Sequence, residues 1–141
     1  HEVLRTTFEE IDGEPRARIA PECDIAVERA VLDADPAQDF DARLRRTIDA
    51  HVAVEFDLAR GPLLRVATVA LGADEHLIIA VIHHILADGW SLRVLAAELS
   101  ACYDARRRGA ADPLAALPLQ YGDFAAWERQ PNWTAVLVAV I

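Results

Sequence analysis

Methionine is absent from this chain of 141 residues, and the first residue is His1. The chain therefore lacks a natural start residue, and we expect it to be a piece of a longer protein. Cysteine is nearly absent, because Cys23 and Cys102 are the only two and lie far apart, without the close spacing of metal ligands. We expect both to be free thiols in a cytoplasmic protein.

Long apolar runs and basic runs are also missing. The longest terminal apolar run, residues 134–141, is far shorter than the roughly 20 residues that a membrane-spanning helix needs, and no signal peptide is recognisable. The formal net charge is −9, and the longest basic run is Arg106-Arg107-Arg108. These features argue against a membrane or a nucleic acid as partner. The 53% of hydrophobic residues suffices for the core of one domain.

Two adjacent histidines end an apolar run and are followed by an Asp-Gly pair, so that His83, His84, Asp88 and Gly89 form the pattern HHxxxDG. Residues 76–83 are predicted to form one strand, and apolar side chains on both of its faces are typical of a central strand, with a buried helix as the alternative. Consecutive strand side chains point to opposite faces. The two rings are therefore not expected to converge on a zinc ion, and we predict no metal site.

The rest of the sequence predicts an α/β fold, an α+β sandwich with about five strands and two long helices. Strand-like runs at residues 3–10 and 16–20 flank the hairpin signal Asp12-Gly13. A further strand is predicted at 25–32, and residues 63–71 are predicted to pair with 76–83 in an antiparallel manner. The sheet is expected to be mostly antiparallel or mixed.

Two long helices are predicted from apolar spacing. The first opens at Asp35-Pro36, and its apolar face consists of Phe40, Leu44, Ile48 and Val52. The second spans residues 91–108 and stops at Gly109; its apolar stripe consists of Leu92, Leu95, Ala96, Leu99 and Cys102 or Tyr103. A loop is predicted at 110–119 and a short helix at 121–129.

Several stretches of the chain carry motifs in a fixed order. Residues 1–8, HEVLRTTF, are similar to the motif RHExLRTxF without its leading Arg. HHxxxDG follows at 83–89, and residues 121–129, YGDFAAWER, are similar to YxDFAxWQR with Glu128 where Gln is usual. Residues 56–65, FDLARGPLLR, are similar to a further segment that is found in the same family as these motifs. Together they resemble the condensation domains of nonribosomal peptide synthetases, which belong to the acyltransferase superfamily related to chloramphenicol acetyltransferase.

This resemblance implies a chloramphenicol acetyltransferase-like lobe. Residues 1–130 would be the N-terminal lobe of a condensation domain, incomplete at both ends, and residues 131–141 form a tail that we leave unassigned. In this family the active site lies in a channel between two similar lobes, and the sequence holds neither the second lobe nor the family's first motif. We therefore expect the isolated chain to be inactive.

The activity that the resemblance implies is amide formation. A donor acyl or peptidyl group moves from its thioester to the α-amine of an acceptor aminoacyl thioester. Both substrates are attached as thioesters to the phosphopantetheine arms of carrier proteins, so we expect no cofactor bound directly to this chain. The implied partners are peptidyl or acyl carrier protein domains, the C-terminal lobe of the same domain and an adenylation domain in the parent chain.

The resemblance assigns the catalytic role to His84, with His83 as its partner in the motif. Asp88 precedes a helix and is predicted to cap its N-terminus, or else to pair with Arg5. Gly89 is expected to allow a tight turn, with an oxyanion contact through its N–H as the alternative.

Other polar and aromatic residues have structural readings beside functional ones. Trp90 and Ser91 are candidates for substrate binding, whereas packing of Trp90 and helix capping by Ser91 are the structural alternatives. We expect a structural corner formed by Tyr121, Asp123 and Trp127, and surface or packing roles for His1, His51 and His76.

Three other functions remain open at this point. The chain is compatible with another HHxxxDG acyltransferase that uses a coenzyme A thioester, and with an epimerisation domain. Cyclising relatives carry aspartates in place of the histidines, unlike this chain. A non-catalytic module that only docks carrier proteins is the alternative from a different class, and an assay for amide formation would separate it from an enzyme.

Overall fold

The computed structural model describes residues 1–32 and 39–129. It begins with a short 3-10 helix, η1 (Glu2–Arg5), which leads into an antiparallel hairpin of β1 (Thr6–Ile11) and β2 (Glu14–Ile19). The turn residues Asp12 and Gly13 both have positive φ, 55° and 80°. A two-residue turn of this kind matches the twist of the flanking strands. The predicted hairpin is confirmed, but the prediction that the strand starts at residue 3 is wrong, because residues 3–5 are helical.

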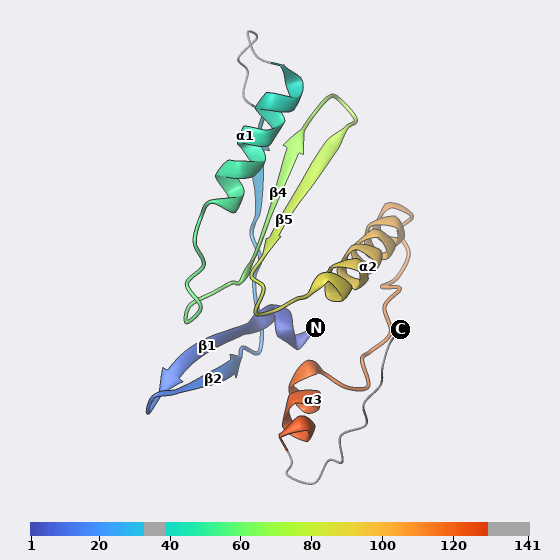
Figure 1. The fold of residues 1–141 in the computed structure, drawn as a ribbon. Coiled ribbons are helices and arrows are strands. Elements are labelled where there is room, and N and C mark those ends of the chain that lie inside the picture. Colours follow the sequence, from blue (N-terminus) through green and yellow to red (C-terminus); the bar gives the residue numbers. More distant parts are fainter. Residues whose placement is uncertain (33–38, 130–141) are drawn as a thin grey trace, which may run out of the picture.

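A second sheet contains β3 (Val27–Val31), β4 (Leu64–Ala70) and β5 (His76–Ile82) in that spatial order. β3 runs parallel to β4, and β5 runs antiparallel to it, so the sheet is mixed and the α/β class is confirmed (Figure 1). The prediction that β5 is a central strand is wrong. Within the described chain β5 is an edge strand, and Ile78 on its open face is 48% exposed.

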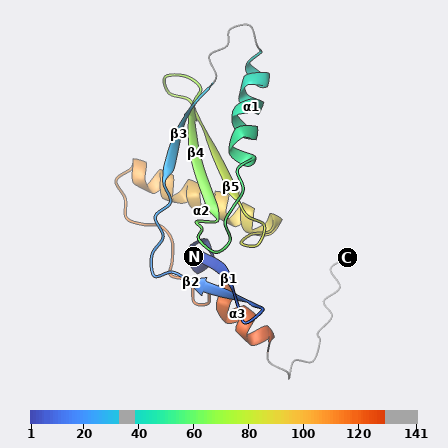
Figure 2. The same ribbon diagram turned by 90° about the vertical axis from the view of Figure 1, so that its left-hand side faces the viewer.

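The helix α1 (Phe40–Val52) connects β3 to β4 and lies along the sheet (Figures 1 and 2). Leu44 and Ile48 of its predicted apolar face pack against the core. The buried side chains of this core cluster are Leu32, Ala67, Val69 and Ile79. The predicted helix start at Asp35-Pro36 lies outside the described residues, as does the tail 131–141.

The helix α2 (Gly89–Arg107) follows β5 and ends as predicted. Gly109 adopts φ 64° just beyond the helix. Its N–H donates to the Arg106 carbonyl at 3.1 Å, and the Ala110 N–H donates to the Ala105 carbonyl at 2.9 Å. These two bonds satisfy carbonyl groups that the last helical turn leaves without partners, and glycine adopts the left-handed conformation without steric strain.

The apolar stripe predicted on α2 is largely open to solvent. Leu92, Leu99 and Tyr103 are 44%, 48% and 59% exposed, and the buried residue of the helix is Ala105. Figure 1 shows α2 diverging from the sheet after the turn that follows β5. The stripe is apolar as predicted, but the described part of the chain leaves most of it exposed.

The short helix α3 (Tyr121–Glu128) confirms the predicted helix near the end of the chain. The Gln120 side chain and the Asp123 side chain cap each other's backbone in a capping box. The Gln120 side-chain oxygen also accepts a hydrogen bond from the Glu2 N–H at 3.0 Å, which ties α3 to η1. A structural role for Asp123 is confirmed, whereas Tyr121 and Trp127 are 67% and 56% exposed and do not form a packed corner.

The described residues also bear on the cysteines, on membrane crossing and on metal binding. Cys23 and Cys102 are both free thiols, as predicted. In the described ranges, no helix is long and apolar enough to cross a membrane. The same residues contain no group of three or more His, Cys, Asp or Glu side chains arranged to hold a metal ion.

Candidate active site

His83 directly follows β5 and is fixed through its backbone on both sides. Its N–H donates to the Leu63 carbonyl at 3.0 Å, which extends the pairing with the start of β4. Its carbonyl accepts from the Leu86 N–H at 2.9 Å, which closes the turn that contains His84 and Ile85. The position of His84 therefore depends on a turn that His83 holds at its base.

The two imidazole rings have different surroundings, as predicted, but strand alternation is not the cause, because β5 ends at Ile82 and both histidines lie beyond it. The half-buried His83 ring packs edge-on against Phe56, with ring centroids 5.8 Å apart and an interplanar angle of 86°. His83 Nδ1 accepts a hydrogen bond from the Ile85 N–H at 3.1 Å, so the neutral ring carries its proton on Nε2. His84 is exposed. Of the two, His84 is the one that a reacting group in solvent can reach.

Asp88 caps the N-terminus of α2, which confirms the first of its two predicted roles. Its Oδ1 accepts from the Ser91 N–H at 2.8 Å and from the Ser91 hydroxyl at 2.7 Å. These two bonds, the hydroxyl contributing most, lower the pKa of the Asp88 carboxyl below its usual value. The negative charge also lies at the positive end of the helix dipole.

The alternative pairing of Asp88 with Arg5 is not found among the described residues. Arg5 instead donates to the Glu2 carboxylate at 3.0 Å and to the Ala20 carbonyl. Its guanidinium thus joins η1 to the end of the β1–β2 hairpin. Asp88 instead accepts from the backbone and the hydroxyl of Ser91, three residues along the chain.

Two predictions about the start of α2 are wrong. Ser91 is not the cap residue; it is the third residue of the helix and donates to the cap, Asp88. Gly89 does not occupy a crowded turn, because it lacks a positive φ and a Cβ built on it would meet no atom within 4 Å. An oxyanion contact by the Gly89 N–H stays a prediction.

We expect Asp88→Ala to lower the melting temperature of the protein by a few degrees, because the first turn of α2 loses its cap. Activity should fall with it, since α2 begins shortly after His84. Thermal denaturation of the variant and wild type measures the effect. An unchanged melting temperature together with lost activity would instead assign Asp88 a direct chemical role.

The same cap should depend on pH with a defined sign. Because the folded-state pKa of Asp88 is lowered, the ionised cap stabilises fully above the unfolded pKa of about 3.9, and that contribution is lost as pH falls through the folded pKa. Asp88→Asn keeps an acceptor oxygen but cannot ionise. The melting-temperature advantage of wild type over Asp88→Asn should therefore shrink below about pH 4; a constant difference from neutral to acid pH would contradict this.

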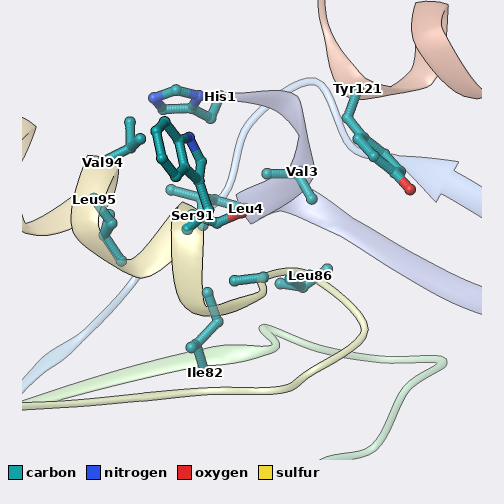
Figure 3. A pocket seen from close by; sticks show the side chains of 11 residues that line it. His1, Val3, Leu4, Ile82, Leu86, Ser91, Val94, Leu95 and Tyr121 are labelled. Carbon is teal, nitrogen blue, oxygen red and sulfur yellow. The ribbon is translucent and has the colours of Figure 1, made fainter. Parts of the chain in front are cut away.

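A cavity of about 220 Å³ lies where η1, the end of β5 and the first turns of α2 meet (Figure 3). Trp90 and Ser91 line it, together with mostly aliphatic side chains such as Leu4 and Leu95, while His84 does not. Trp90 is 70% exposed and lies 5.0 Å from the Arg93 guanidinium. The structure thus brings Trp90 and Ser91 to one cavity and keeps His84 out of it. A role for either residue in binding substrate stays a prediction.

The remaining histidines have surface or packing roles, as predicted. His1 Nε2 contacts the Glu98 carboxylate at 2.5 Å and joins η1 to α2. His51 Nδ1 bonds to the Thr47 carbonyl at 2.7 Å within α1, and His76 is exposed.

Two residues that no sequence pattern connects to the motif lie next to it in space. Phe56 contacts His83, and the Arg65 guanidinium carbon lies 3.9 Å from the centre of the Phe56 ring. Both residues are in the stretch FDLARGPLLR, but no spacing rule connects them to a histidine that is 27 residues beyond Phe56 in the sequence. The one available signal was that this stretch resembles a segment of the condensation domains, to which no role had been assigned.

Known proteins with this fold identify the class to which the chain belongs. Its structure superimposes on the first condensation domain of the calcium-dependent antibiotic synthetase, solved with a substrate analogue, with a TM-score of 0.73 and 26% identity. The match covers 92% of this chain and 32% of that one. The epimerization domain from the third module of tyrocidine synthetase B also gives a TM-score of 0.73 at 26% identity, over 89% of this chain and 28% of that one.

The sequence match is equally extensive. The condensation domain family matches residues 1–134, and the chain belongs to that family. A linear gramicidin synthase of Brevibacillus parabrevis is 43% identical over 130 residues, which is 92% of this chain and 3% of that protein. The chain thus spans a small part of this peptide synthetase and under a third of either of the two solved domains.

Proposed function

We propose that this chain is part of a domain that forms peptide bonds in nonribosomal peptide synthesis, with His84 as its catalytic residue. The observation that supports this proposal most directly is the exposed His84, held in a closed turn at the end of β5, within HHxxxDG. Residues 1–130 would form the N-terminal lobe, which contributes one wall of the active site.

The reaction proposed is the attack of an α-amine on a thioester. The nitrogen lone pair of the acceptor adds to the carbonyl carbon of the donor, the C–N bond forms, the C–S bond breaks, and the sulfur leaves on the donor's phosphopantetheine arm. An α-amine has a pKa of about 7.7–8.0, so a useful fraction is already neutral near pH 7. His84 therefore orients the amine and accepts its proton as the C–N bond forms, and that proton finally balances the departing thiolate.

The partners in this proposal carry the substrates. Both thioesters are presented by peptidyl or acyl carrier protein domains through phosphopantetheine, so this chain needs to bind no cofactor of its own. An adenylation domain would load the acceptor, and the C-terminal lobe would supply the opposite wall. A cytoplasmic location stays a prediction.

Amide formation between two loaded carrier proteins tests the proposal with the full-length protein. Donor-loaded and acceptor-loaded carriers are mixed with it, and the acceptor carrier is analysed for the condensed product by mass spectrometry. Product on the acceptor arm is the expected result. Carriers that bind to the protein without forming product would instead support a docking module.

Epimerisation is the second candidate function, because the epimerization domain of tyrocidine synthetase B has the same fold. Epimerisation inverts the α-carbon of a single carrier-bound residue and needs no second carrier. The assay above separates the two reactions if the stereochemistry of the released residue is also measured. A change of configuration without a new amide would replace our proposal with this alternative.

A further inference from the structure

The His83 ring is the middle of a row of three side chains and a backbone amide. On one side, Ile85 donates its N–H to His83 Nδ1 at 3.1 Å. On the other side, the edge-on Phe56 ring lies 5.8 Å away, centre to centre. The ring of His83 is thus held by a hydrogen bond and an aromatic contact at once.

Arg65 packs against the face of the Phe56 ring. The guanidinium lies over the ring, with its central carbon 3.9 Å from the ring centre, an arrangement in which the cation is attracted to the π-electrons. Its nitrogens also donate to the backbone carbonyls of Glu55 at 3.2 Å, of His51 at 3.4 Å and of Val54. A planar guanidinium with five N–H donors can make several such bonds and still stack on a ring.

These carbonyl groups belong to the end of α1 and the segment just after it. α1 ends at Val52, and the last carbonyls of a helix lack partners inside the helix and carry partial negative charge. Arg65 supplies donors and positive charge there and so fixes the loop that carries Phe56. The loop position, in turn, fixes where the ring of Phe56 meets His83.

His84 has no comparable support of its own. It is exposed, and no described residue makes a hydrogen bond or a ring contact with it. Its direction is set by the backbone of the turn, which His83 holds at its carbonyl and at Nδ1. If the His83 ring could rotate, the hydrogen bond that its Nδ1 accepts from the Ile85 N–H would weaken, and Ile85 directly follows His84 in the turn.

We propose that Phe56 and Arg65 are positioning residues for His84, acting through the His83 ring and the turn of residues 83–86. This inference rests on the proposed function only for the role of His84. The row from the end of α1 to the turn orients His84 towards the amine, and its loss leaves substrate binding intact while slowing the chemical step.

Phe56→Leu in the full-length protein tests the aromatic contact. We expect kcat for amide formation to fall about 10- to 100-fold, because small misplacements of a reacting group have effects of that size, with KM for the acceptor nearly unchanged. Phe56→Tyr keeps the ring and should restore kcat. Phe40→Leu is the matched control, since Phe40 is a partly exposed aromatic at the opposite end of α1, and it should leave kcat unchanged.

Arg65→Lys tests the same row without touching Phe56. Lysine keeps the charge but cannot bond three carbonyls and cover the ring together, so we expect a smaller loss of kcat in the same direction. Arg60→Lys is its control, because the Arg60 side chain is 88% exposed. This pair of variants keeps the proposal testable if Phe56→Leu does not fold.

Amide hydrogen exchange measured by mass spectrometry reports on the turn independently of activity. Exchange at Ile85 and Leu86 should be faster in Phe56→Leu and Arg65→Lys than in wild type and in both controls. Faster exchange with an unchanged kcat would overturn the positioning role, and so would a lowered kcat with unchanged exchange. If His84→Ala proves fully active, the proposed function fails, while the exchange result still decides whether the row holds the turn.

Discussion

Replacing His84 with alanine in the full-length protein is expected to lower the rate of peptide-bond formation by at least about 100-fold, because acid–base help of this kind contributes about 10²–10⁴-fold. The fold should be unaffected. His84 is exposed and lacks hydrogen-bond and ring partners among the described residues, so its removal takes away no packing. Product formation between two loaded carriers measures the rate, and circular dichroism verifies the fold.

His76→Ala provides the matched control for this variant. His76 is also an exposed histidine of the same strand region, at the first position of β5, and we expect its replacement to leave the rate unchanged. Wild-type turnover in His84→Ala would remove His84 from the mechanism. Equal losses in both variants would point to a general effect on β5 rather than to catalysis.

The 141-residue chain by itself is expected to form no amide above background, even with both carriers loaded. His84 is exposed, and in the proposed two-lobe arrangement the isolated chain offers the thioester arms no opposing wall. Water therefore competes with the amine for hydrogen bonds, and the gain from positioning, which can reach several kcal/mol, is lost. The assay for product on the acceptor arm, run beside the full-length protein, measures this directly.

The same chain should self-associate. Ile78 of β5 and Leu92, Leu99 and Tyr103 of α2 are between 44% and 59% exposed, and apolar patches beyond a few hundred Å² tend to drive association. Size-exclusion chromatography with light scattering gives the mass of the species formed. A monodisperse monomer that catalyses condensation would show that one lobe suffices, and the two-lobe proposal would then have to be dropped.

Features specified by neighbouring residues were predicted well from the sequence. Asp12-Gly13 predicts its hairpin because both positions need a positive φ, and Gly109 predicts the end of α2 for the same reason. The positions of β5 and α2 in the fold were harder to predict. Periodicity tells that Ile78 or Leu99 lies on an apolar face, but it does not tell which part of a molecule covers that face.

In the candidate site, too, some features could be predicted from local sequence and others could not. Capping by Asp88 follows from its residue type and from the helix that comes next. The separation of His83 from His84 was predicted from strand alternation, but β5 ends at Ile82 and the turn after it separates the two rings. The contacts of Phe56 and Arg65 do not follow from either. They depend on how the end of α1, the start of β4 and the end of β5 come together in space, and no local pattern contains that information.

The mixed sheet has a consequence for the order in which the chain folds. β4 and β5 are joined by a short turn, with Ala70 paired to His76, whereas Val31 of β3 pairs with Ala70 only after the whole of α1 has been crossed. Closing a long loop costs more entropy and slows the contacts that need it. The β4–β5 hairpin should therefore assemble first and β3 should dock onto it late, and we expect the strand that leads into His83 and His84 to belong to the folding nucleus.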